Sequence, residues 1–120
     1  MRGRLFLIHW NPSEGEHLAR DLRAANWRVD LETEDRTRAC RRIRERRPDA
    51  LVISLARSPV YGLDVACAVR NGTSANAPIV FLDGTEDAVK AARARVPAAI
   101  FTTSGELAET LVAYARAGWG

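Results

Sequence analysis

Three apolar runs in the sequence each lead into a side chain that could do chemistry. The residues that follow the runs are a hydroxyl, an imidazole and a carboxylate: Ser54, His9 and Asp83. If the runs are parallel strands, their carboxyl ends share one edge of a sheet, so the three side chains would lie together. They could then act as a nucleophile, a general base and the group that orients the base. The sequence has no GxSxG elbow and no evident oxyanion hole, so a small hydrolase is the less favoured interpretation. The favoured one is that the three residues hydrogen-bond to fill the edge.

Five apolar runs have the character of strands. The run that follows Pro48 and Asp49 is typical of a strand buried on both faces, as in a parallel sheet. Segments of helical periodicity separate the runs, and this alternation predicts an α/β fold, (βα)5, with a doubly wound, parallel five-stranded sheet and right-handed crossovers. The expected strands are Arg4–Ile8, a second that begins within Asn26–Val29, then Ala50–Ile53, Pro78–Leu82 and Ala98–Thr102.

Local signals predict the limits of the first two helices. Ser13 and Glu16 have the spacing of a capping box for the first helix, and Asn26 can take the left-handed position that follows it. The second helix is rich in arginine, and its apolar stripe is thin, so we expect it to be the most solvated helix. That stripe consists of Ala39, Cys40 and Ile43.

The remaining helices have weaker signals. A loop over residues 56–61 is expected before a third helix that opens at Gly62, and a fourth helix is expected from about Thr85 to Arg95. Ser104 is the expected cap of the last helix. The residues of that helix expected to face inward are Leu107, Leu111, Tyr114 and Ala115.

The central strand and its surroundings resemble the receiver domain of bacterial two-component response regulators. A receiver strand of the form PD-x-apolar3 leads to the aspartate that accepts a phosphoryl group, and Pro48–Ser54 has this form. Gly62 stands eight residues after Ser54, as in the family, whereas Pro59 comes one residue late. The segments Asn26–Val29 and Pro78–Leu82 also match receiver patterns. The resemblance spans nearly the whole chain and implies a flavodoxin-like, CheY-like sheet with strand order 2-1-3-4-5.

The positions that carry receiver chemistry differ in this chain. By the resemblance, an acidic pair, the phospho-accepting aspartate, a Thr or Ser, and a Lys would stand at the carboxyl ends of the strands. The residues found there are His9, Trp10, Ser54, Asp83 and Thr103. Mg2+ prefers oxygen ligands that include one or two carboxylates, and a serine without an adjacent base is a weak nucleophile. We therefore expect a degenerate receiver without metal, enzymatic activity or aspartyl phosphorylation, which acts in phosphorelay-type signalling through protein–protein contact.

Two altered positions allow further interpretations. Asp83 could imitate a phosphoryl group, with Arg57 or His9 as its counter-charge, or it could cap the helix that follows. The Trp10 ring is expected to fill the former metal pocket, and the alternative is that Trp10 and Tyr61 form an aromatic patch that faces a partner.

The resemblance also suggests a partner surface on the fourth helix, the fifth strand and the fifth helix. Its residues here are Lys90, Arg93, Glu109 and Arg116. The expected partner is a kinase, regulator or effector domain, or a second copy of the chain.

The arginines of the second helix suggest another class of partner. Several arginines on one solvated helix could contact the phosphates of a nucleic acid or another polyanion. The candidate contacts are Arg38, Arg41, Arg42 and Arg46. Glu45 interrupts the cluster and an acidic patch precedes it, so local ion pairing is the favoured interpretation and nucleic acid the alternative.

Composition sets the broad class. The 120 residues, 47% hydrophobic and 28% charged, suit a single receiver-like domain over residues 1–120. The net charge of +3 comes almost entirely from arginine, since Lys90 is the one lysine, and it is weak evidence for nucleic acid. Cys40 and Cys67 lack metal-site spacing, and no apolar run reaches the roughly 18 residues of a membrane span. No Walker A, GxGxxG or HExxH motif is present. We expect a cytoplasmic protein without a cofactor.

Overall fold

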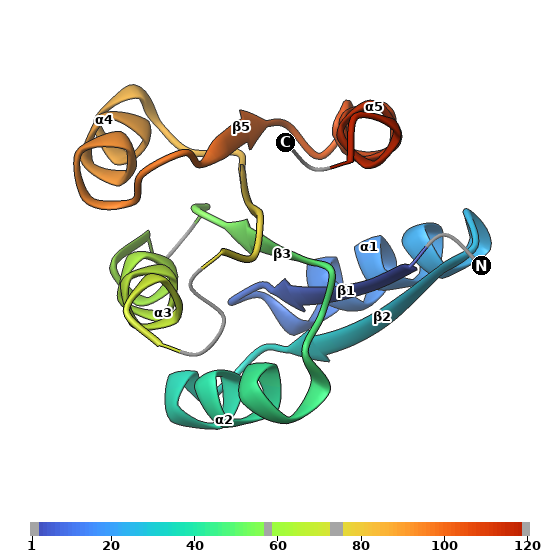
Figure 1. Cartoon of the computed structure of the whole chain (residues 1–120), viewed down its shortest axis with the longest axis horizontal. Helices are drawn as coiled ribbons and strands as arrows, with labels where there is room; N and C mark the ends of the chain where they lie inside the picture. The colour runs from blue at the N-terminus through green and yellow to red at the C-terminus, as the bar shows by residue number, and fades with distance from the viewer. Residues whose placement is uncertain (1–2, 57–58, 73–75, 119–120) are drawn as a thin grey trace.

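The computed structural model describes residues 3–56, 59–72 and 76–118. The strands form one parallel sheet in the order β2-β1-β3-β4-β5, which confirms the predicted topology (Figure 1). The strands are β1 (Gly3–Ile8), β2 (Trp27–Glu32), β3 (Ala50–Ser54), β4 (Ile79–Leu82) and β5 (Ile100–Thr102). Every residue of β3 is buried, as expected for the central strand of a sheet covered on both faces.

Helices cover both faces of the sheet. The helices are α1 (Pro12–Ala24), α2 (Arg36–Arg46), α3 (Pro59–Arg70), α4 (Glu86–Arg95) and α5 (Leu107–Arg116). In Figure 1, α1 and α5 lie on one side of the sheet, and α2 and α3 on the other. Successive residues of β1 enter two separate cores: Leu5 and Leu7 pack with residues of α1 and α5, whereas Phe6 and Ile8 pack with residues of α2, α3 and α4.

The start of α1 differs from the prediction. The N-cap is Asn11, whose side-chain oxygen accepts a hydrogen bond from the backbone N–H of Glu14 at 2.9 Å. The predicted capping box of Ser13 and Glu16 is wrong, because Pro12, whose fixed φ suits the first helical position, starts the helix before Ser13. At the other end, Asn26 has φ 77°, which confirms its left-handed conformation.

Helix α3 begins at Pro59 and not at Gly62. Gly62 serves a packing role inside the helix. A Cβ atom there would lie 2.8 Å from Cγ2 of Ile53 and 3.3 Å from the carbonyl oxygen of Ser54. The glycine eight residues after Ser54 therefore allows α3 to approach the end of β3 closely.

Of the predictions for the last two helices, the position of α4 is confirmed and the cap of α5 is wrong. Thr85 caps α4, which confirms the expected position of that helix. Ser104 does not cap α5, because the N-cap position is Glu106 and Ser104 bonds elsewhere. Leu107 and Leu111 are buried as predicted, but Tyr114 is 40% exposed, so its predicted inward orientation is wrong.

The arginine-rich helix α2 buries only Ala39 and Ile43, and Cys40 is half-buried. No helix in the described ranges combines the length and apolar character needed to cross a bilayer.

Candidate functional site

The loops at the carboxyl ends of β1, β3, β4 and β5 bring together the residues singled out in the sequence. Ser54 ends β3 and is fully buried, and its hydroxyl oxygen accepts a hydrogen bond from the backbone N–H of Ala56 at 3.2 Å. His9 follows β1 and is also buried. Its Nδ1 accepts a hydrogen bond from the backbone N–H of Asn11, and its Nε2 lies 3.7 Å from a carboxylate oxygen of Glu14.

Asp83 ties two loops together. Its carboxylate accepts hydrogen bonds from the backbone N–H of Ser104, at 2.9 Å, and from the Ser104 hydroxyl. Asp83 has φ 55°, a left-handed conformation in which an aspartate is more tolerable than most residues. The loop after β4 is thus joined to the loop after β5. Thr103, in that second loop, accepts a hydrogen bond from the backbone N–H of Glu106 through its side-chain oxygen.

These bonds change two interpretations of Asp83. It does not cap α4, because Thr85 does. Nor is it placed to orient His9 in a hydrolase, because its carboxylate is engaged by Ser104 and the acid within 4 Å of His9 is Glu14. The proposed counter-charge Arg57 lies outside the described residues.

Trp10 and Tyr61 come together beside this edge. Their ring centroids are 5.6 Å apart in an edge-to-face arrangement, and the guanidinium of Arg36 lies 5.3 Å from the centroid of Tyr61. The indole N–H of Trp10 is buried without a hydrogen-bond partner. Tyr61 is 48% exposed, so part of this aromatic pair faces solvent.

The donor set does not fit Mg2+. At the positions where a metal-binding carboxylate pair would be needed, the chain has an imidazole, His9, and an indole, Trp10. Both oxygens of Asp83 are hydrogen-bonded to Ser104. Across the residues that the structure describes, no group of three His, Cys, Asp or Glu side chains is arranged to hold a metal ion.

A hollow of about 730 Å3 lies over the same edge. Its walls include three carboxylates, those of Glu14, Asp21 and Asp83, together with His9 and His17. None of its described lining residues is a lysine or an arginine. The fixed charges on the described walls of this hollow are therefore negative, which disfavours the approach of an anionic phosphoryl donor.

Glu32, at the end of β2, forms a second buried polar centre that was not predicted from the sequence. This carboxylate is 2% exposed and receives two hydrogen bonds of 2.6 Å from the guanidinium of Arg38. Arg42 lies 3.4 Å away, and the backbone N–H groups of Glu34 and Asp35 donate to the same carboxylate. These hydrogen bonds, that from Arg38 foremost, lower the pKa of Glu32 from 4.5 to about 2, against the opposing effect of burial. The signal was present in the alternation of Asp30 and Glu32 along a strand that precedes arginines four residues apart.

The arginines of α2 therefore differ in the partners that their side chains contact. Arg38 and Arg42 bind Glu32, and Arg42 also donates to the carbonyl oxygen of Leu31. Arg41 lies 4.0 Å from Glu45. Two of the four arginines predicted to contact polyanions are thus held by an internal carboxylate.

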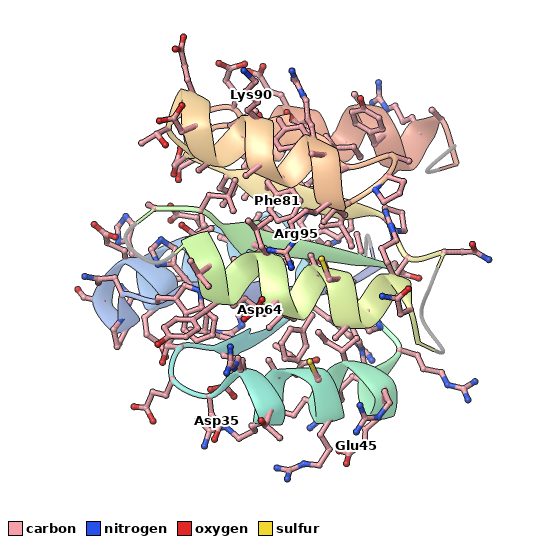
Figure 2. All side chains as sticks on the ribbon, turned by 90° about the vertical axis from the view of Figure 1, so that its left-hand side faces the viewer. Asp35, Glu45, Asp64, Phe81, Lys90 and Arg95 are labelled. Atoms are coloured by element: carbon pink, nitrogen blue, oxygen red, sulfur yellow. The ribbon has the colours of Figure 1, made fainter. Side chains whose placement is uncertain are left out.

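Three of the four residues of the predicted partner surface line two different grooves. Arg93 packs over Phe101, 4.9 Å from its ring centroid, and lines a groove of about 700 Å3 that also includes Tyr114. Glu109 and Arg116 line another hollow, of about 450 Å3, with Trp27. Lys90 projects from α4 (Figure 2).

Solved structures of other proteins share this arrangement of strands and helices. A two-component response regulator of the LuxR family from Aurantimonas is 23% identical, with a TM-score of 0.78 over 96% of this chain and 86% of that one. The receiver domain of Francisella response regulator 1452 has a TM-score of 0.77 at 14% identity, over 97% and 98% of the two chains. The chemotaxis protein CheY4 of Vibrio cholerae has a TM-score of 0.75 at 18% identity, over 90% and 94%. The chain has the receiver fold.

No protein-family model matches the chain, and no curated protein matches its sequence. Within the receiver fold, His9 and Trp10 follow β1, Ser54 ends β3, Asp83 follows β4 and Thr103 follows β5. The structure thus places all five at the carboxyl edge of the sheet.

Proposed function

We propose that this chain is a receiver-fold signalling domain that works without aspartyl phosphorylation and acts through contact with another protein. The observation that carries the proposal is the state of Ser54. It is fully buried at the end of β3 and its hydroxyl is bonded to the backbone of Ala56. Among the described residues, no hydrogen bond joins this hydroxyl to a basic side chain that could activate it.

The neighbouring residues support the same conclusion. Phosphoryl transfer requires a metal ion or cations to take up charge on the transferring oxygens. Here the two positions after β1 hold His9 and Trp10, and Asp83 bonds to Ser104. The Asp83–Ser104 pair joins the loops after β4 and β5 in a fixed arrangement that no phosphoryl group has to induce.

Incubation with acetyl phosphate and Mg2+, followed by intact-protein mass spectrometry, tests this part of the proposal. We expect no phosphoryl adduct on the wild-type chain, and none on Ser54→Asp, because that variant restores the acceptor but not the carboxylates of the metal site. A receiver with an intact acidic site is the positive control. A stoichiometric adduct on the wild-type chain would overturn the proposal.

For the partner surface we favour the groove between α4, β5 and α5. It combines an exposed aromatic, Tyr114, with Arg93 stacked over Phe101. Aromatic residues and arginine are the residue types enriched at the centres of protein interfaces.

A photo-crosslinking amino acid at Tyr114 tests this surface in cells that express the protein, with the same amino acid at exposed Arg20 on α1 as the control. We expect a discrete crosslinked species, with a kinase, a regulator or a second copy, from position 114 only. Equal crosslinking from both positions, or none, would contradict the assignment.

A further inference from the structure

Charged side chains on α2 face charged side chains on β2, and the two sets are spaced almost equally along the two elements. Residues 38, 42 and 46 are one helical turn apart on α2, and residues 28, 30 and 32 alternate along β2 on the face of the sheet that α2 covers. Four helix residues rise about 6 Å and two strand residues about 6.7 Å, so the two series stay in step over three levels.

The first two levels pair opposite charges. Arg38 binds Glu32 with two bonds of 2.6 Å. Arg42 lies 4.0 Å from Asp30 and 3.4 Å from Glu32.

At the third level, the residue of β2 that corresponds to Arg46 of α2 is Arg28 and not an acid. A third arginine joins them. Arg4 is the Cα partner of Arg28 in the neighbouring strand, so the two side chains leave the same face of the sheet. The Arg4 guanidinium reaches the carbonyl oxygen of Arg46 at 3.5 Å. Arg4 thus lies beside Arg28 in the sheet and contacts the backbone of Arg46 at the amino edge, opposite the site built around Ser54. These three residues are here called the arginine triplet.

Two acids lie near the arginine triplet, and neither forms an ion pair with one of its guanidinium groups. Asp49 accepts a hydrogen bond from the backbone N–H of Arg4. Glu45 lies 4.0 Å from Arg41. Among the described residues, no ion pair is formed by the side chain of any member of the triplet. Figure 2 shows nitrogen-tipped side chains around the C-terminal end of α2, near the labelled Glu45.

The helix dipole explains only part of this cluster. Cations are favoured at a helix C-terminus, where α2 presents about half a negative charge. That effect accounts for Arg46, but Arg4 and Arg28 come from the beginnings of strands. The three guanidinium groups exceed the charge of Asp49 and the half charge of the helix end together, so the surface stays positive. Like charges on directly opposite strand residues disfavour folding, which gives the arrangement a cost that an anionic ligand would offset.

We propose that the arginine triplet binds a phosphate-bearing anion. Planar guanidinium forks match phosphate oxygens in a bidentate manner, and the three groups come from two neighbouring strands and the end of one helix. The phosphate could belong to a free polyphosphate or to the backbone of a nucleic acid. Of the four polyanion contacts predicted from the sequence, the triplet includes only Arg46, and the proposal is independent of the proposed signalling function.

The test measures binding of sodium pyrophosphate by calorimetry and of a labelled DNA duplex by fluorescence anisotropy, both at low salt. The variants are Arg28→Glu, Arg28→Gln and Arg46→Gln. The control is Arg20→Gln, which makes the same charge change on α1, in the opposite layer. Circular dichroism and thermal unfolding verify that each variant folds. Arg28→Glu supplies the missing acid, so we expect it to unfold at the same or a higher temperature than the wild type.

We expect Arg28→Glu to weaken binding by about tenfold or more, and the two glutamine variants by about three- to tenfold, with the control within about twofold. Loss of a phosphate contact should also flatten the dependence of affinity on salt. Pyrophosphate binding that follows this pattern assigns a free phosphate, and the same pattern with DNA alone assigns a nucleic-acid backbone. The proposal is overturned if neither probe binds saturably, or if Arg20→Gln weakens binding as much as Arg28→Gln.

Discussion

Glu32 shows how a single residue can be misjudged from sequence. It stands close before α2, where a carboxylate is often no more than a favourable charge near the helix N-terminus. In the structure it is buried and accepts hydrogen bonds from Arg38 and from two backbone N–H groups. The charge therefore holds β2 and α2 together.

The variant Glu32→Gln should destabilise the fold by about 2–3 kcal/mol. Removing one member of a buried pair costs about 3–5 kcal/mol, but the Arg38 side chain is 42% exposed and solvent screens the pair. Urea denaturation measures the change. The control is Glu34→Gln, since Glu34 lies 3.6 Å from the same arginine but is 73% exposed. We expect that control to stay within about 0.5 kcal/mol of wild type, and equal losses from both variants would refute the role given to Glu32.

The same residue predicts a dependence of stability on pH. In the folded state, the hydrogen bond from Arg38 and those from the backbone lower the pKa of Glu32 from 4.5 to about 2. A lowered pKa contributes stability that is complete above the unfolded value and disappears as the pH falls through the folded value. Wild-type stability should therefore decline between about pH 5 and pH 2, and the decline should be shallower in Glu32→Gln. Urea midpoints measured across this range test the prediction, and parallel curves would contradict it.

At the scale of elements, the strands and the start of α4 were predicted correctly, whereas the starts of α1, α3 and α5 were not. Ala50–Ile53 and Ile79–Leu82 are continuous apolar runs, which are typical of strands buried on both faces of a parallel sheet. Helix starts depend on one or two polar residues, and several candidates compete within a turn. Pro12 and Pro59 decide the starts of α1 and α3, because proline suits the first turn of a helix. The two prolines therefore mark the observed starts of both helices.

The cap of α1 gives a test at this scale. Asn11→Ala removes the acceptor for the Glu14 N–H and should cost about 1 kcal/mol of stability. Ser13→Ala, two residues away and exposed, should change stability by less than about 0.5 kcal/mol. Thermal unfolding of both variants measures the difference. A larger loss from Ser13→Ala would restore the capping box that the structure excludes.

Helix α3 is also held from both sides. The carboxylate of Asp64 lies 2.6 Å from Arg36 of α2 and 3.7 Å from Arg95 of α4, and Figure 2 shows Asp64 between these two helices. All three side chains are partly exposed, so each pair contributes little alone. Their value is to fix how α2, α3 and α4 sit beside one another on one face of the sheet.

At the scale of the whole molecule, the fold was easier to predict from the sequence than the side-chain contacts at the carboxyl edge of the sheet. The alternation of strands and helices predicted a parallel, doubly wound sheet, and the resemblance to receiver domains supplied the strand order, which the structure confirms. The hydrogen bonds at the edge were not predictable. Nothing in the sequence indicates that Asp83 would bond to Ser104, 21 residues away, in place of His9 or the next helix. Sites depend on side-chain geometry, which the sequence pattern does not specify.

The proposed function requires that the carboxyl edge of the sheet does not bind Mg2+ and a phosphoryl group. The most direct measurement is an amide NMR titration with Mg2+ and beryllofluoride, an acyl-phosphate mimic, with a receiver that has an intact acidic site as the control. We predict no saturable shifts at Ser54, Asp83 or Thr103. Saturable shifts confined to these residues would show that the edge still binds the metal and the phosphoryl mimic, and would contradict the proposal.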